Sequence, residues 1–109
     1  MSYLLNKKCV PCEGKTKPLS KKETKVFMKE ISGWRFDKKY GKISKEFEFE
    51  DFVDSILFVN KISQIAEEEG HHPNIHIFYN KVLVELSTHD IKGLSENDFI
   101  IAAKIDALV

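Results

Sequence analysis

A long amphipathic segment in the middle of the chain constrains the fold most strongly. Between Asp51 and Glu69, apolar residues recur every three to four positions, which is the period of an α-helix with one buried face. Gly70 follows, and glycine readily adopts the left-handed conformation that ends a helix. On both sides of this segment the apolar residues alternate with a period of two, which predicts strands. The predicted helix at 51–69 therefore lies between two strand pairs in the sequence.

The first strand pair runs from Trp34 to Phe49 around a polar turn at Gly41. After the helix, Asn80-Lys81 separates two further strand-like runs, at 74–79 and 82–88. Asn tolerates the left-handed conformation that a two-residue hairpin loop needs, so we interpret Asn80-Lys81 as that loop.

Two capping boxes mark helices near the ends of the chain, one from Ser20 to Glu23 and one from Ser95 to Asp98. The order α-β-β-α-β-β-α predicts an α+β fold in which three helices pack on one face of a four-stranded antiparallel sheet. With 109 residues, the chain fits one domain, which we place at 19–109. Residues 1–18 hold two of the three prolines and the motif Cys9-x-x-Cys12, and we predict an N-terminal arm there.

The charge and hydropathy of the chain argue against several classes of function. Lys plus Arg and Asp plus Glu both number 17, so the formal net charge is zero, whereas direct binding to nucleic acid requires a basic excess. No apolar run approaches the length of a transmembrane helix, and the apolar stretch near the N-terminus is too short for a signal peptide. We therefore expect a cytoplasmic protein with reduced thiols and no membrane association.

The second hairpin decides where the histidines meet. A loop at Asn80-Lys81 gives a register in which six apolar residues share one face, in the pairs Tyr79–Val82, Ile77–Val84 and Ile75–Leu86. Continued toward the open end, this register places His72 opposite His89 and His71 near Asp90. It also places His76 opposite Glu85, which we interpret as a polar cross-strand pair rather than as part of a site.

Converging imidazoles can both donate and accept protons near neutral pH, which is the requirement for general acid–base catalysis. Gly70 and Pro73 give the helix a stiff exit that fixes where His71 and His72 point. The alternative is that adjacent histidines at a helix end are surface residues favoured by the helix dipole.

The spacing of these residues is typical of one enzyme family. The series Glu67, His71-His72-Pro73, Tyr79, His89 and Asp98 resembles the signature of the pterin-4a-carbinolamine dehydratases, and Gly33-Trp34 and the stretch FEFEDF at 47–52 also look like that family. The similarity covers roughly residues 18–109. It implies the fold predicted above, with no metal and no organic cofactor, in a homodimer or homotetramer.

The resemblance also implies an activity. Members of the family are hydro-lyases that dehydrate 4a-hydroxytetrahydropterin to quinonoid dihydropterin, which recycles the tetrahydrobiopterin cofactor of aromatic amino acid hydroxylases. In some animals the same fold is also a dimerisation cofactor for a homeodomain transcription factor. Two alternatives therefore stay open: a non-enzymatic interaction module, and a dehydratase for another pterin, such as a compound of molybdopterin metabolism.

Site residues follow from the resemblance position by position. His71, His72 and His89 are the implied active-site histidines, with His71 and His89 as acid and base and His72 mainly binding substrate. The residues implied to line the site or orient the histidines are Trp34, Glu67, Pro73, Thr88, Asp90, Ile91 and Asp98. From the residues alone, Asp98 is equally consistent with a helix cap and Trp34 with plain core.

Two kinds of metal site are alternatives to this interpretation. The four histidines and nearby carboxylates are possible ligands, but adjacent histidines on a strand point to opposite faces, which makes joint ligation awkward. Cys9 and Cys12 supply two of the four ligands that a structural zinc site usually needs. We therefore predict no metal and assign the two cysteines no role beyond free thiols.

Overall fold

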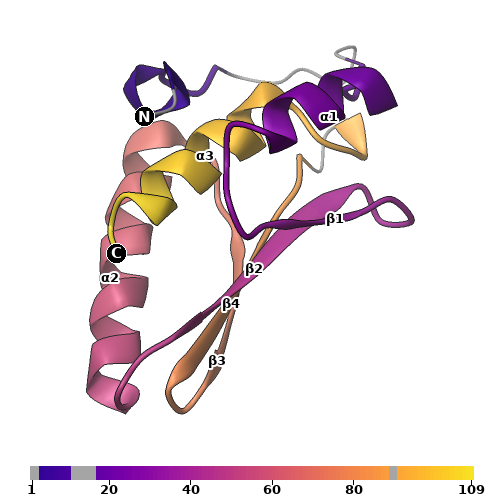
Figure 1. Cartoon of the computed structure of the whole chain (residues 1–109). Helices are drawn as coiled ribbons and strands as arrows, with labels where there is room; N and C mark the ends of the chain where they lie inside the picture. Colours follow the sequence, from indigo (N-terminus) through magenta and orange to yellow (C-terminus); the bar gives the residue numbers. More distant parts are fainter. Residues whose placement is uncertain (1–2, 11–16, 89–90) are drawn as a thin grey trace.

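The computed structural model describes residues 3–10, 17–88 and 91–109. Its elements are the 3₁₀-helix η1 (Tyr3–Asn6), the helices α1 (Lys21–Met28), α2 (Phe52–Glu69) and α3 (Glu96–Asp106), and the strands β1 (Arg35–Asp37), β2 (Lys42–Glu48), β3 (Asn74–Phe78) and β4 (Lys81–Leu86). The strands form one antiparallel sheet in the order β1-β2-β4-β3. The helices lie on one side of it (Figure 1), so the predicted fold class and element order are confirmed.

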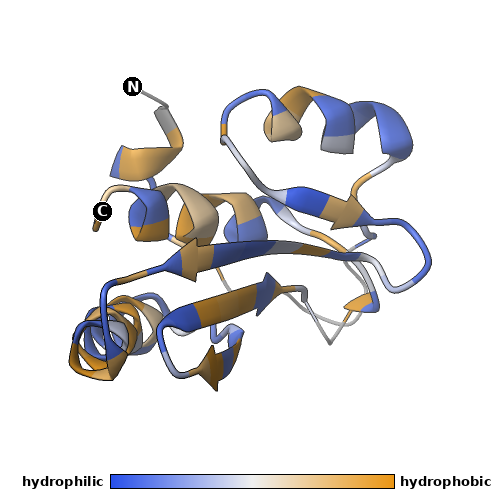
Figure 2. Cartoon of the chain, turned by 60° about the horizontal axis from the view of Figure 1, so that its bottom comes forward, coloured by the Kyte–Doolittle hydropathy of each residue, from blue (hydrophilic) through white to orange (hydrophobic). Residues whose placement is uncertain are grey.

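Local sequence signals set the helix boundaries. The Ser20 backbone N–H donates to Glu23 Oε1 at 2.9 Å, and the Glu23 N–H donates to Ser20 Oγ at 3.2 Å, which confirms the first capping box. α2 begins after Asp51, whose side chain accepts from the Asp54 N–H at 2.8 Å. It ends at Gly70, which has the left-handed φ of 65°. Figure 2 looks nearly along α2 and shows polar and apolar residues around its circumference.

The core lies between the sheet and α3. The inward face of the sheet contributes Ile43, Phe47, Val82, Val84 and Leu86, each at most 7% exposed. α3 lies against η1, α1 and α2 and is buried along most of its length, so it is the central helix of the domain. Each large apolar side chain buried in this way contributes about 1.5–3 kcal/mol to folding.

The first residues of the chain take part in this core. Leu4 is fully buried, and the Lys104 ammonium of α3 donates to the Leu5 carbonyl at 3.1 Å. Figure 1 shows η1 next to the C-terminal end of α2 and close to α3. Packing of the arm was not foreseen, because one apolar residue in a polar segment carries no periodic signal.

The predicted register of the second hairpin was wrong by two residues. The loop is Tyr79-Asn80, and the pairs are Phe78↔Lys81, Ile77↔Val82, His76↔Leu83, Ile75↔Val84 and Asn74↔Glu85. Asn80 is held by the end of β2: its carbonyl accepts from the Phe49 N–H at 2.7 Å, and its side-chain amide donates to the Phe49 carbonyl at 3.1 Å. Tyr79, with φ 52°, takes the left-handed position instead.

A shift of two residues leaves every side chain on its predicted face, because strand side chains alternate with a period of two. It does remove the cross-strand argument for the histidines. In the observed register His76 lies opposite Leu83 rather than Glu85, and the strands no longer place His72 opposite His89.

Candidate active site

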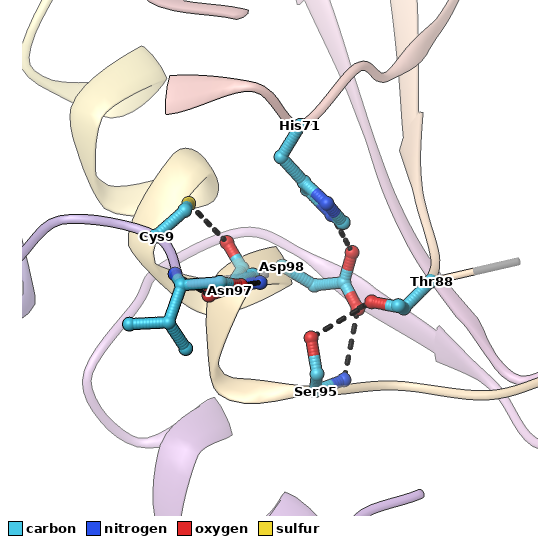
Figure 3. A network of polar contacts seen from close by, with 7 residues as sticks. Cys9, His71, Thr88, Ser95, Asn97 and Asp98 are labelled. Atoms are coloured by element: carbon cyan, nitrogen blue, oxygen red, sulfur yellow. Dashed lines mark hydrogen bonds and ion pairs between the residues drawn. The ribbon is translucent and has the colours of Figure 1, made fainter. Parts of the chain in front are cut away.

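The strongest candidate site lies where α2 ends and α3 begins. Gly70 turns the chain out of α2, and the His71 N–H donates back to the Ala66 carbonyl at 3.2 Å. The His71 side chain then reaches across to the first turn of α3, where its Nε2 lies 2.6 Å from Asp98 Oδ1 (Figure 3). The two side chains are 11% and 0% exposed, so this is a nearly buried histidine–carboxylate pair.

Asp98 is fully satisfied by its neighbours. Its Oδ2 accepts from the Thr88 hydroxyl and from the Ser95 N–H, both at 2.9 Å. The Ser95 hydroxyl completes the network by donating to Thr88 Oγ1 at 2.7 Å. A buried carboxylate is tolerated only when hydrogen-bonded in this way, and the positive end of the α3 dipole adds to its stabilisation.

This network gives the two nitrogens of His71 different roles. An ionised carboxylate can only accept, so Nε2 carries the proton that binds Asp98. Nδ1 is then the basic nitrogen of the neutral ring, and it has no hydrogen-bond partner among the described residues. A histidine held by one nitrogen and basic at the other is the arrangement that a general base requires.

His72 faces a different partner. Its Nε2 lies 2.5 Å from Glu67 Oε2, and the two side chains are 59% and 77% exposed. The two adjacent side chains therefore point to different environments: His71 joins the buried network, and His72 is exposed to solvent. His76 does contact Glu85, at 2.8 Å, but diagonally across the strands rather than directly opposite.

The loop after β4 begins at the same network. His89 and Asp90 lie outside the described residues, so their predicted places in the site are not described. Their neighbours Thr88 and Ile91 are 5% and 6% exposed, and the Ile91 N–H donates to the Thr88 carbonyl at 3.3 Å. The structure thus brings together His71, Thr88 and Asp98, with Pro73 partly buried two residues beyond His71.

Trp34 is not part of this cluster. Its indole N–H donates to Asp106 Oδ2 at 3.0 Å, at the other end of α3. Asp106 lies eight residues from Asp98, or about 12 Å along the helix. Trp34 is 6% exposed and packs edge-on against Phe47, which is the environment of a core residue.

The N-terminal arm makes contacts that no pattern in the sequence predicts. The Val10 N–H donates to Asn97 Oδ1 at 3.0 Å, and the Asn97 amide donates to the Val10 carbonyl at 2.6 Å. The Cys9 N–H donates to Glu69 Oε1 at 2.8 Å. Asn97 precedes Asp98, and Glu69 lies two residues before His71. Residues 9–10 therefore connect the two segments that carry the buried pair, and Figure 3 shows the contact with Asn97.

The Cys9 thiol is part of this contact. It donates to the Asn97 carbonyl at a sulfur–oxygen distance of 3.7 Å. Burial, together with the negative charges of Glu69 and Asp98, raises the pKa of Cys9 to about 12. Cys9 is therefore a protonated thiol at neutral pH. Cys12, the second cysteine of the predicted motif, lies outside the described residues.

Neither a metal cluster nor a membrane span is found in the part of the chain that the structure describes. Within residues 3–10, 17–88 and 91–109, no three His, Cys, Asp or Glu side chains are placed to hold one metal ion. No helix in these ranges is both long and apolar enough to cross a bilayer.

Comparison with known proteins decides the family. The family model described as pterin 4 alpha carbinolamine dehydratase matches residues 17–108. The chain belongs to this family. A protein of Nitrosospira multiformis, provisionally named pterin-4-alpha-carbinolamine dehydratase, is 49% identical over 106 residues, which cover 96% of this chain and 91% of that protein. A Rickettsia canadensis protein of the same name is 46% identical over the full length of both chains.

Solved structures agree with the family assignment. A Brucella melitensis protein described as a transcriptional coactivator/pterin dehydratase has a TM-score of 0.80 and 30% identity, covering 84% of this chain and 98% of that one. A pterin dehydratase-like protein described as a RuBisCO assembly factor of the α-carboxysome has a TM-score of 0.61 and 28% identity, covering 70% and 88%. Cys9 and Val10 lie outside the span that the dehydratase family model matches.

Proposed function

We propose that this protein dehydrates a 4a-hydroxytetrahydropterin to the quinonoid dihydropterin by histidine acid–base catalysis, and so recycles a tetrahydrobiopterin-type cofactor. The observation that carries the proposal is the buried His71–Asp98 pair, in a chain of the dehydratase family. The pair provides an oriented base. Its hydrogen-bond network includes Thr88, the residue directly before His89 in the sequence.

The reaction needs one proton delivered and one removed. The bond between C4a and the hydroxyl oxygen breaks, the hydroxyl leaves as water after accepting a proton, and the N5 proton is lost as the C4a–N5 double bond forms. We assign His71, through Nδ1, and His89 to these two steps. Each well-placed acid or base typically contributes about 10²–10⁴-fold to the rate.

The remaining residues have supporting roles in this proposal. Asp98 orients His71 and fixes its tautomer, and Glu67 orients His72, which binds the substrate. Pro73, Thr88, Asp90 and Ile91 line the site. Trp34 is left out, because its contacts are with Asp106 and Phe47.

A stopped-flow assay tests the proposal. A phenylalanine hydroxylase generates 4a-hydroxytetrahydropterin in situ, and the quinonoid product is followed by absorbance with wild type, His71→Ala and His89→Ala. We expect wild type to accelerate dehydration and both variants to lose most of that acceleration. A folded wild-type protein that gives only the spontaneous rate would refute the activity on this substrate, and other pterins, including those of molybdopterin metabolism, would be tested next.

We also propose that the active form is a homodimer or homotetramer. Several large apolar side chains of α2 and of the β3–β4 hairpin are 38–65% exposed: Phe52, Val53, Leu57, Ile77, Phe78 and Tyr79. Apolar residues gathered on a surface often mark an interface between chains. Light scattering on the eluting protein gives the mass directly, and a monomer at micromolar concentration would refute this part.

The second candidate function is an interaction module. Two structural neighbours are described as a transcriptional coactivator/pterin dehydratase and as a RuBisCO assembly factor. The exposed apolar side chains of α2 favour the same possibility here. His71→Ala separates the two functions, because it removes turnover without changing that surface. A cytoplasmic location remains a prediction from the sequence.

A further inference from the structure

A hollow between α1 and the edge strand β1 shares no lining residue with the His71 network. It encloses about 520 Å³ and is lined by Lys21, Thr24, Lys25, Met28, Lys29, Phe36 and Lys38. Figure 1 shows α1 above β1 at one edge of the sheet. This volume lies within the range of about 300–1,000 Å³ that is usual for small-molecule sites.

Three residues of the lining carry no charge, and we call Thr24, Met28 and Phe36 the floor of the hollow; two of them are large and apolar. Thr24 is 3% exposed, Met28 is half-buried, and Phe36 is 39% exposed although it lies in a strand. An exposed phenylalanine ring beside a methionine offers a contact surface to the flat or aliphatic part of a ligand. The floor alone would favour any apolar group.

The rest of the lining, which we call the rim, consists of lysines. Lys21, Lys25 and Lys29 recur every fourth residue, so they lie along one side of α1 over about 12 Å, and Lys38 faces them from the end of β1. No carboxylate lines the hollow. Among the described residues none of these four lysines forms an ion pair, whereas Lys42 pairs with Glu85 and Lys45 with Asp106.

Two of the ammonium groups are neighbours. Lys21 and Lys38 lie close enough that the hydrogen bond and charge of Lys21 lower the pKa of Lys38. The wider segment has the same sign, because residues 17–45 contain ten Lys or Arg and three Asp or Glu in a chain of zero net charge. Positive charge therefore exceeds negative charge in this segment, and the charged residues that line the hollow are all lysines.

We propose that the hollow binds a small ligand with at least two negative charges on an apolar or aromatic body, such as a nucleoside polyphosphate or another phosphorylated heterocycle. The lysines match the charges, since ammonium groups bind phosphate as point charges. Thr24, Met28 and Phe36 match the body. The proposal does not depend on the dehydratase activity.

An NMR titration of the full chain tests this, with ATP, adenosine and tripolyphosphate as separate probes. ATP should shift the amide signals of α1 and β1 residues that line the hollow. Adenosine lacks the charges and tripolyphosphate lacks the body, so each should bind at least about tenfold more weakly than ATP. Binding of ATP should weaken as salt is added.

Variants locate the site. The double variant Lys21→Gln/Lys38→Gln should weaken ATP binding at least about tenfold, because two charge-assisted contacts are lost. Lys22→Gln/Lys39→Gln is the matched control: it removes two charges from the neighbouring positions in the same two segments, and neither Lys22 nor Lys39 lines the hollow. The ¹H–¹⁵N spectra show whether each variant is folded.

Three outcomes would overturn the proposal. The first is the absence of shifts at the hollow up to about 5 mM ATP. The second is equal weakening by Lys22→Gln/Lys39→Gln, which would mean general attraction of anions to the basic segment. The third is tripolyphosphate binding as tightly as ATP, which would remove the role of the apolar floor.

Discussion

His71 and His72 are adjacent in the chain, and each has a carboxylate partner, but the two pairs lie in different environments. His71 and Asp98 are 11% and 0% exposed, whereas His72 and Glu67 are 59% and 77% exposed. Asp98 also binds Thr88 and Ser95, while Glu67 has no second hydrogen bond among the described residues. The two histidines therefore do not differ in having a carboxylate partner; they differ in the hydrogen-bond network behind that partner, and we assign acid–base catalysis to the one with the network.

The difference predicts a large contrast in turnover. His71→Gln should lower kcat by about 10²–10⁴-fold, because it removes a general acid or base from the proposed reaction. His72→Gln should mainly raise KM, because we assign His72 to substrate binding. Steady-state kinetics of both variants decide the matter, and equal losses of kcat would contradict the assignment of distinct roles.

The same contrast should appear in stability. Asp98→Ala leaves His71, Thr88 and the Ser95 N–H without their acceptor, and we expect a loss of about 3–5 kcal/mol in the free energy of unfolding. Glu67→Ala should cost less than about 1 kcal/mol, since exposed pairs contribute little. Urea denaturation measures both. Similar losses in the two variants would show that the Asp98 network stabilises the fold no more than the exposed Glu67 pair does.

The arm offers a way to disturb the buried pair indirectly. Asn97→Ala removes both hydrogen bonds to Val10 and should loosen Asp98, so we expect kcat to fall about tenfold, as for a misplaced catalytic group. The ring ¹⁵N shifts of His71 should change from a single tautomer to a mixture. Cys9→Ala keeps the Asn97–Val10 bonds and is the control. Unchanged His71 shifts in Asn97→Ala would show that the arm is only packing.

Cys9 reports on the same burial through its reactivity. Its pKa of about 12 means that the nucleophilic thiolate forms only at strongly alkaline pH. In a Cys12→Ser background, iodoacetamide should therefore modify folded protein far more slowly than urea-unfolded protein at pH 8. Fast modification of the folded chain would mean that residues 9–10 detach from Asn97 in solution.

The pair of His76 and Glu85 should contribute least to stability. Hydrogen bonds from Lys42 and then His76 hold the pKa of Glu85 below its ordinary value. A lowered pKa means that this contribution to stability is present above the pKa of the unfolded chain and is lost as the pH falls through the folded value. Glu85→Gln should cost less than about 1 kcal/mol at pH 7 and nothing at strongly acidic pH, by urea denaturation at each pH.

Local signals accounted for most of the fold. The Ser20–Glu23 capping box, the Asp51 cap and the Gly70 stop each depend on residues within one helical turn, and the strand faces depend on alternation alone. The hairpin register failed because Asn80 is fixed by Phe49, thirty-one residues away, which no local pattern encodes. An error of two residues preserved every strand face and so left no trace in the hydrophobic pattern.

The candidate site also has features that the sequence indicated and features that only the structure reveals. The resemblance to the dehydratase family pointed to His71, His72 and Asp98, and the capping-box spacing at Ser95–Asp98 was visible by itself. Neither indicated that Asp98 would serve both the helix cap and His71. The Val10–Asn97 contact spans 87 residues and involves a backbone group, so side-chain patterns could not reveal it. Trp34 was grouped with the site by resemblance, and its contact with Asp106 became visible only in three dimensions.

The burial of Leu4 beside α3 also bears on how the chain is made. Leu4 is synthesised long before its partner helix, Glu96–Asp106, which begins 92 residues later in the sequence (96 − 4). Until then, the nascent chain carries an apolar residue with no core to enter, and the inward face of the sheet lacks its central helix. Closing so long a loop adds little entropic cost compared with a loop of half its length. The timing of synthesis, rather than chain entropy, therefore delays completion of this core until α3 has been made.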